Sequence, residues 1–264
     1  MLKLDNVSKL FNPGTPDEKI ALLGIDLELL SGDFVTIIGS NGAGKSTLMN
    51  IISGVMKPDL GDVRVEGSSI SHLAEYQRSR WIGRVFQDPM AGTAPHMTIE
   101  ENLAMAYKRG MNRGFAFGVS AAKRTMFREQ LNRLGIGLEN RLRAKVGLLS
   151  GGERQALSLL MATFTEPQIL LLDEHTAALD PSRAELITKL TESIVRELKL
   201  TTLMVTHNME QAIRLGNRLI MMDKGTVVLD IDETRKKDLT VERLLGEFET
   251  ISGHKLADDR MMLG

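Results

Sequence analysis

Residues 34–46 read FVTIIGSNGAGKS, an apolar run followed by glycines, a lysine and a serine. The apolar, β-branched residues 34–38 predict a buried strand, and residues 45–53 predict a helix that ends at Gly54. Glycines between a strand and a helix let backbone N–H groups close around phosphate oxygens, and the helix N-terminus adds partial positive charge. Residues 39–46 therefore predict a phosphate-binding loop that follows a buried strand.

Amides and side chains of this loop are expected to contact a nucleotide. Lys45 is expected to reach the β- and γ-phosphate oxygens, and Ser46 to ligate Mg²⁺. The alternative is an ordinary glycine-rich turn, which the strand–helix context disfavours. The expected nucleotide-binding residues of the loop are Gly39, Ser40, Asn41, Gly42, Ala43, Gly44, Lys45, Ser46 and Thr47.

Two adjacent acids end a second apolar run, ILLLDE at residues 169–174. Carboxylates at the mouth of a buried strand lose solvation unless a cation or a hydrogen-bond donor compensates them. Asp173 is suited to Mg²⁺ or its water shell, and Glu174 to the base that polarises an attacking water. A solvated turn after the strand is the alternative, and the phosphate loop upstream favours the catalytic interpretation.

The third motif is LSGGERQ at residues 149–155. Ser150 and Glu153 fit the pattern of a capping box, so a plain helix start is the simplest interpretation. However, Gly151 and Gly152 follow the capping serine directly, and a glycine in a helix costs about 1 kcal/mol relative to alanine. Two glycines make sense here if another group approaches the backbone closely.

With these three motifs in this order, the chain resembles the ATP-binding cassette (ABC) family of ATPases over about residues 2–225. The resemblance implies that ATP and Mg²⁺ are the cofactors. It also implies that ATP binds between two copies of the chain, or between this chain and a similar cassette. Ser150, Gly151 and Gly152 would then contact the γ-phosphate of the ATP held by the partner.

The resemblance assigns roles to four further residues. Gln87 matches the family's Q-loop and would touch Mg²⁺ or the attacking water, and His207 matches the switch histidine at the γ-phosphate. Asp180 lies in the D-loop at the dimer interface, and Phe11 matches an aromatic that stacks on adenine. The simpler interpretations are a solvent-facing Gln, a surface His, an N-cap Asp before Pro181 and a core Phe. The implied catalytic residues are Glu174, His207, Gln87 and Lys45, and the implied metal ligands are Ser46, Gln87 and Asp173.

Two positions depart from the family's usual pattern. His175 stands where proline is common, and Ala177 stands where serine is common. Losing the serine hydroxyl would alter contacts across the dimer. His175 is either a titratable group near the γ-phosphate or a packed loop histidine. Neither change removes a group needed for hydrolysis.

The alternation of strand and helix patterns predicts an α/β fold. Its core is a mostly parallel sheet with helices on both faces, preceded by an antiparallel β portion at the N-terminus. The resemblance implies a P-loop NTPase core formed by residues 1–90 and 147–231. A helical subdomain at residues 91–146 would interrupt this core.

Capping and periodicity locate two of the helical segments. Thr98 and Glu101 form a second capping-box pattern, which begins a helical stretch extending to about residue 134. The tail at residues 232–264 contains one expected helix, at residues 241–248, and is too short for a separate regulatory domain.

Composition narrows the function classes. The chain of 264 residues carries 33 basic and 34 acidic side chains, so no net charge favours nucleic acid or an anionic membrane surface. The absence of cysteine excludes disulfides and zinc–cysteine sites within this chain. No apolar run approaches the roughly 20 residues that a membrane-spanning helix needs. We therefore expect an intracellular protein that binds no nucleic acid and leaves the membrane-spanning part to another chain.

The expected function is an ATP-hydrolysing subunit of a membrane transporter, peripheral on the inner face of the cell membrane. Two cassettes would close around two ATP molecules and pull on transmembrane permease partners docked near residues 88–103. Residues 87–103 and 173–181 look similar to bacterial importers of small organic solutes such as amino acids, which act with a substrate-binding protein. The alternatives are a soluble ABC ATPase, such as one for iron–sulfur cluster assembly, and a P-loop kinase or GTPase, which would not explain LSGGERQ.

Overall fold

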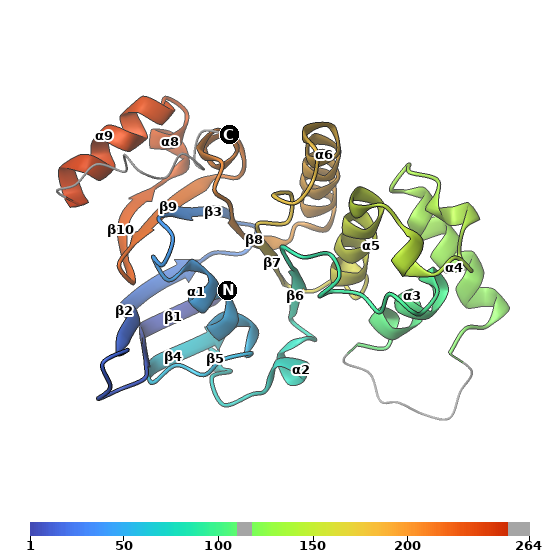
Figure 1. Ribbon diagram of the computed structural model, residues 1–264, viewed down its shortest axis with the longest axis horizontal. Coiled ribbons are helices and arrows are strands. Elements are labelled where there is room, and N and C mark those ends of the chain that lie inside the picture. The colour runs from blue at the N-terminus through green and yellow to red at the C-terminus, as the bar shows by residue number, and fades with distance from the viewer. Residues whose placement is uncertain (110–117, 253–264) are drawn as a thin grey trace. The chain divides into compact units, whose positions relative to one another are not determined.

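The structure is a computed structural model that describes residues 1–109 and 118–252. Contacts between Cα atoms divide the chain into two compact units, one of residues 1–78 and 200–264 and one of residues 79–199 (Figure 1). The helical segment expected at residues 91–146 lies within the second unit. Residues 253–264 of the expected tail lie outside the described residues.

Parallel strands form the centre of the first unit. β3 (Phe34–Gly39) lies between β8 (Thr201–Val205) and β9 (Arg218–Asp223) and is parallel to both. β10 (Thr226–Ile231) adds to β9 in antiparallel orientation. β3 and β8 are buried along their whole length, which explains why they read as continuous apolar runs rather than alternating ones.

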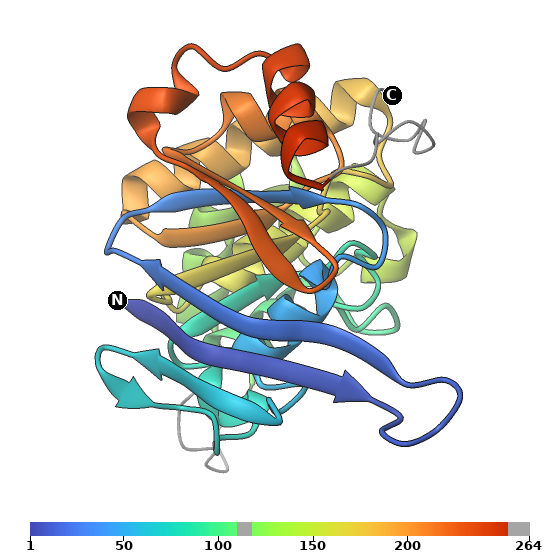
Figure 2. The same cartoon turned by 90° about the vertical axis from the view of Figure 1, so that its left-hand side faces the viewer.

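An antiparallel sheet of order β2-β1-β4-β5 occupies the N-terminal part of this unit. Figure 2 shows β1 and β2, in blue, as two long ribbons running side by side. The strands of the antiparallel sheet are β1 (Leu2–Phe11), β2 (Lys19–Leu29), β4 (Leu60–Val65) and β5 (Ser68–Ser69). This sheet confirms the antiparallel portion predicted from the sequence.

The helices of the first unit complete its core. α8 and α9 lie beside β9 and β10 in Figure 1. Leu244 and Phe248 of α9 are buried against Ile38 of β3 and Leu219 of β9. The helices are α1 (Lys45–Ser53), α2 (Glu75–Arg78), α7 (Met209–Arg214), α8 (Glu233–Lys236) and α9 (Val241–Ser252).

Arg78 fastens the C-terminal end of α1. Its side chain is fully buried, and Nη1 donates to Ile51 O at 2.7 Å and to Ile52 O at 3.0 Å. Nε and Nη2 donate to Leu73 O and Ser71 O. Burial lowers the pKa of Arg78. These bonds satisfy carbonyl groups at the end of the helix that follows the phosphate loop.

In the second unit, β6 (Ile82–Val85) pairs in parallel with β7 (Ile169–Asp173). Gly83 of β6 has no room for a side chain, because a Cβ there would lie 2.3 Å from Ala162 O of the helix that passes over it. The helices of this unit are α3 (Ile99–Tyr107), α4 (Ala121–Asn132), α5 (Gly151–Thr163) and α6 (Pro181–Leu198), with 3-10 turns η1 (Leu138–Asn140) and η2 (Val146–Leu148).

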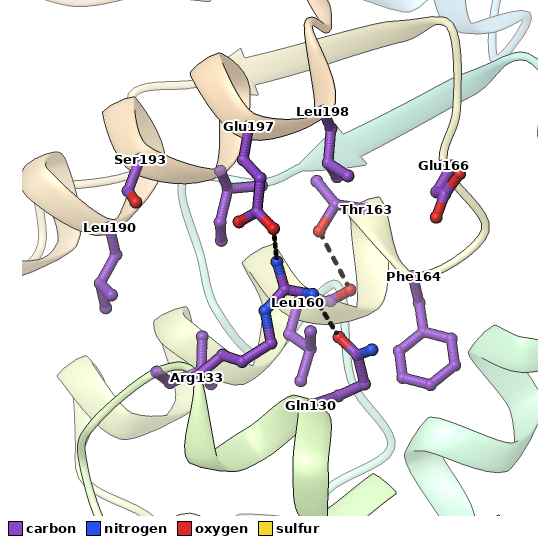
Figure 3. Close-up of a pocket in the computed structure, with 12 residues that line it drawn as sticks. Gln130, Arg133, Leu160, Thr163, Phe164, Glu166, Leu190, Ser193, Glu197 and Leu198 are labelled. Carbon is purple, nitrogen blue, oxygen red and sulfur yellow. Dashed lines mark hydrogen bonds and ion pairs between the residues drawn. The ribbon is translucent and has the colours of Figure 1, made fainter. Parts of the chain in front are cut away.

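The four helices share one apolar cluster, which includes Leu103, Phe127, Leu157 and Ile187. Residues of α4, α5 and α6 line a cavity of about 120 Å³. Figure 3 shows the ion pair that two of its lining residues, Arg133 and Glu197, form. The sequence predicted one helical stretch over residues 98–134. Instead, α3 ends at Tyr107 and α4 begins at Ala121.

Candidate functional site

The backbone of the phosphate loop requires glycine at both of its ends. Gly39 has a φ of 152°, and a Cβ there would lie 2.2 Å from Met222 O. Gly44 has a φ of 103°, and its Cβ would lie 2.4 Å from Ala21 O. Both positions combine a conformation that L-residues avoid with a close approach of another backbone.

Lys45 is buried over this loop. Its Nζ donates to Gly39 O at 2.6 Å and to Ser40 O at 3.0 Å, which fixes the ammonium group against the loop backbone. Ser40 is held in turn by Asp223, whose Oδ1 lies 3.3 Å from its Oγ. Asn41, Gly42 and Ser46 are exposed, and Thr47 is half-buried.

The N-terminus of α1 is open to an external acceptor. No side chain caps this helix at Gly44. By contrast, Thr98, Ser150 and Asp180 each accept a hydrogen bond from the first turn of α3, α5 and α6. The partial positive charge and N–H groups at the start of α1 are therefore suited to a phosphate.

Two other predicted residues lie in the same unit as the phosphate loop. Phe11 ends β1 and is half-buried, with Lys9 Nζ 5.9 Å from its ring centroid. His207 follows β8 and is half-buried. The turn after His207 is fixed by Thr206, whose hydroxyl donates to Gln211 and accepts from the backbone N–H of Asn208.

The two acids at the end of β7 differ in environment. Asp173 is 13% exposed, and its Oδ2 accepts from Arg84 Nη2 at 2.8 Å. Glu174 is half-buried and has a φ of 45°, a left-handed conformation that is uncommon outside glycine. Such backbone strain is typical of functional sites, where the surrounding structure holds a side chain in one required direction. The turn directs the chain away from β7 immediately after the acid pair.

Gln87 is exposed, and the residue before it is anchored. Gln155, the last residue of LSGGERQ, is fully buried and donates from Nε2 to Phe86 O at 3.2 Å. The helix that carries the signature motif therefore fixes the backbone next to Gln87. No sequence pattern predicted a role for Gln155.

The signature motif begins α5 with the predicted capping box. Ser150 Oγ accepts from Glu153 N at 3.3 Å, and Glu153 Oε2 accepts from Ser150 N at 2.7 Å. Burial acts to raise the pKa of Glu153, but hydrogen bonds from Ser150 and from Arg141 outweigh it and lower that pKa. The capping prediction is confirmed, and the motif's two glycines lie at the start of the helix.

Asp180 and His175 both have structural partners. Asp180 is the N-cap of α6 and accepts from Arg183 N at 3.1 Å, with Pro181 as the first helical residue, as predicted. His175 is 2% exposed and lies with Nε2 3.0 Å from Thr191 Oγ1. Burial lowers the pKa of His175 to about 4, so the ring is neutral at pH 7. Of the two alternatives for His175, the structure has the packed loop histidine.

The predicted site residues fall into two groups. The first unit holds Phe11, the phosphate loop at residues 39–47 and His207. The second unit holds Gln87, Asp173, Glu174, Asp180 and the signature residues Ser150, Gly151 and Gly152. The assembly of these groups around one nucleotide stays a prediction.

Residues 22–177 match the ABC transporter family. The chain belongs to this family. The ABC cassette is 48% identical to the tyrosine transport ATP-binding protein of Clostridioides difficile over 94% of this chain and 99% of that protein. It is 31% identical to the energy-coupling factor transporter ATP-binding protein EcfA2 of Clostridium perfringens, over 92% of this chain and 84% of that protein.

A solved structure supports the same assignment. The ATP-binding cassette MJ0796, in a dimeric post-hydrolysis state with ADP and Pi, is 31% identical and superposes with a TM-score of 0.76 over 88% of this chain and 99% of that chain. This likeness confirms the predicted P-loop NTPase fold. The ABC cassette is thus an ATP-binding and ATP-hydrolysing subunit of a transporter.

No helix among residues 1–109 and 118–252 has the length and hydropathy needed to cross a bilayer.

Proposed function

We propose that two copies of this cassette pair head to tail and hold two ATP molecules between them. Each site takes Lys45, Ser46, Gln87, Asp173, Glu174 and His207 from one copy. Ser150 and Gly152 of the other copy complete it. The dimeric cassette with ADP and Pi among the related structures supports this arrangement.

The observation that carries the proposal is the room around Gly151. A Cβ at Gly151 would meet only the flexible end of Leu179, at an ordinary contact distance of 3.4 Å. Gly151 also has no positive φ to require glycine. Since nothing among the described residues calls for glycine at position 151, we attribute the requirement to a group from outside the chain, namely the partner's γ-phosphate.

The donor set supports Mg²⁺ as the cation of this site. A serine hydroxyl at Ser46, an amide oxygen at Gln87 and a carboxylate at Asp173 are the hard oxygen ligands that Mg²⁺ takes together with phosphates. When bound, Mg²⁺ would neutralise developing charge on the phosphate oxygens. Lys45 would bind the β- and γ-phosphates, and Glu174 would orient and deprotonate the attacking water, with His207 at the γ-phosphate.

A groove near the Q-loop is suited to a permease partner. It has a volume of about 310 Å³, and Met105, one of the residues that line it, is 47% exposed. Met90, which precedes the lining residue Ala91 in the chain, is 39% exposed. Flexible methionines on a surface are typical of adaptable binding faces. Its lining residues are Ala91, Gly92, Thr93, Ala94, Asn102, Met105, Ala106, Arg109 and Met161.

We further propose that the transporter is a bacterial importer of an amino acid, working with a substrate-binding protein. The cassette would then lie on the inner face of the cell membrane. Support comes from the 48% identity to a tyrosine transport ATP-binding protein over nearly the whole of both chains. Uptake of labelled tyrosine by vesicles containing the whole transporter would test this assignment, and uptake of none of the twenty amino acids would refute it.

The dimer is tested with Glu174→Gln, which keeps the site's shape but removes the base. We expect the variant to bind ATP and to form a stable ATP-dependent dimer in gel filtration. Gly151→Ala in that background should fold normally, because the chain leaves room for the methyl group, and should lose the dimer. Lys45→Ala should lose nucleotide binding. A Glu174→Gln protein that stays monomeric at saturating ATP, or a Gly151→Ala variant that still dimerises, would contradict the proposal.

A further inference from the structure

Arg84 is a charged residue in an otherwise apolar strand, and it contacts the acid at the predicted metal site. β6 and β7 run in parallel with Val85 beside Leu172, which brings Arg84 within reach of Asp173 at the end of β7. The Nη2–Oδ2 distance is 2.8 Å, and the two side chains are only 10% and 13% exposed. Ion pairs with so little solvent interact more strongly than surface pairs do.

The guanidinium of Arg84 also contacts an aromatic ring. It lies 4.7 Å from the ring centroid of Phe86, within the range of a cation–π contact. Phe86 is itself anchored through its carbonyl group by Gln155. Arg84 therefore links Asp173 to the residue immediately before Gln87.

We propose that Arg84 is a positioning residue that acts as the counter-ion of Asp173 when no metal is bound, and that it lowers the affinity of the site for Mg²⁺. This inference rests on the proposed role of Asp173 at the metal. Arg84 engages Oδ2, so Oδ1 would be the oxygen that Asp173 offers to the metal or its water shell. Its fixed positive charge repels a divalent cation at that oxygen.

The consequence is that metal loading depends on the nucleotide. Without ATP, Arg84 already compensates the charge of Asp173, so Mg²⁺ gains little by binding there. With ATP bound, the phosphate charges supply the additional attraction that holds the cation in place despite repulsion by the guanidinium. The site is thereby biased to take up Mg²⁺ together with ATP rather than alone.

The test is the Mg²⁺ concentration that half-saturates ATP binding, measured on the full chain with a fluorescent ATP analogue. Arg84→Met should lower this concentration by about tenfold, a modest part of the interaction expected between charges this close. Arg84→Lys keeps the charge and should remain near the wild type. Arg84→Gln keeps a hydrogen-bond donor for Asp173 without the charge, and it should lower the half-saturating Mg²⁺ concentration as Arg84→Met does. It replaces Arg84→Met as the test variant if Arg84→Met folds poorly. Binding of the analogue in EDTA reports that each variant still has an intact phosphate loop.

Two controls separate the possible failures. Arg80 is exposed and stacks on Trp81 at 3.6 Å, so Arg80→Met should not move the midpoint. Asp173→Asn should raise it. If Asp173→Asn raises the midpoint while Arg84→Met and Arg84→Gln leave it unchanged or raise it, the role of Arg84 is refuted and that of Asp173 stands. If Asp173→Asn has no effect, the proposed metal role fails and this inference fails with it.

Discussion

Replacing Arg78 with methionine should destabilise the unit that contains the phosphate loop. The change keeps an unbranched apolar stem but removes four hydrogen bonds, to the carbonyl oxygens of Ile51, Ile52, Leu73 and Ser71. Bonds from a charged donor contribute about 1.5 kcal/mol or more each, which gives roughly 6 kcal/mol. Burial of the guanidinium offsets part of this, as the lowered pKa of Arg78 indicates, so we expect a net loss of about 3 kcal/mol.

Urea unfolding of the nucleotide-free protein, followed by circular dichroism, measures this loss. For a chain of this size, about 3 kcal/mol corresponds to a fall in Tm of roughly 6–12 °C. Arg64→Met is the matched control, because Arg64 is 48% exposed and its partners Asp5 and Asp62 are 33% and 25% exposed, so this ion pair is well solvated compared with the bonds of Arg78. That variant should lose less than about 1 kcal/mol.

The effect of Arg78→Met should be confined to stability. Arg78 contacts the carbonyl groups of Ile51 and Ile52, whereas Lys45 of the phosphate loop begins the same helix, six positions and about 9 Å away from Ile51 along its axis. The folded fraction should therefore bind ATP with unchanged affinity. Equal losses in Arg78→Met and Arg64→Met would show that the buried bonds do not stabilise the end of α1.

Gly39→Ala should abolish ATP binding and lower the free energy of unfolding by at least about 2 kcal/mol, because its Cβ would lie 2.2 Å from Met222 O. Gly14→Ala is the control: its Cβ would have nothing within 4 Å, so the change should cost only the strain of a positive φ. Calorimetric titration with ATP and urea unfolding would check both, and retained ATP binding in Gly39→Ala would contradict the geometry. Burial lowers the pKa of Lys236 from 10.5 to about 8. Between these two pH values the unfolded chain still holds the proton that the native protein has released. The free energy of unfolding should therefore rise as the pH increases from 8 to 10.5. Lys236→Met should remove roughly 2 kcal/mol of that rise after allowance for solvent screening. Lys237 is exposed, so Lys237→Met should leave the rise unchanged. Identical pH profiles of unfolding free energy for both variants would exclude Lys236 as the source.

Local hydrogen-bond patterns made much of the fold predictable. The capping boxes of Thr98 with Glu101 and of Ser150 with Glu153 form as the sequence indicated, because each involves residues three apart on one chain segment. The N-cap at Asp180 is predictable for the same reason. The long apolar runs around β3 and β7 are explained by complete burial in parallel sheets.

Contacts between distant segments could not be predicted in this way. Arg84 and Asp173 are 89 positions apart, and Gln155 and Phe86 are 69 apart, so no local pattern pairs them. A signal did exist, since arginine in the strand IGRV and glutamine on a buried helix face are costly without partners. Sequence reasoning could therefore flag these residues but could not name what they contact.

The two helix N-termini in the proposed ATP site differ in their capping, and this difference predicts an order of binding. α1 has no side-chain cap, so the first-turn N–H groups of α1 are available to phosphate within a single chain. At α5, Ser150 Oγ already accepts from Glu153 N, and the carboxylate of Glu153 places negative charge at the same end. α5 therefore offers a weaker anion site on its own, with the Ser150 hydroxyl proton and the amides of Gly151 and Gly152 left to donate. For the proposed head-to-tail dimer, we therefore expect ATP to bind first to the chain that supplies α1, and the partner's α5 to join a nucleotide already held there.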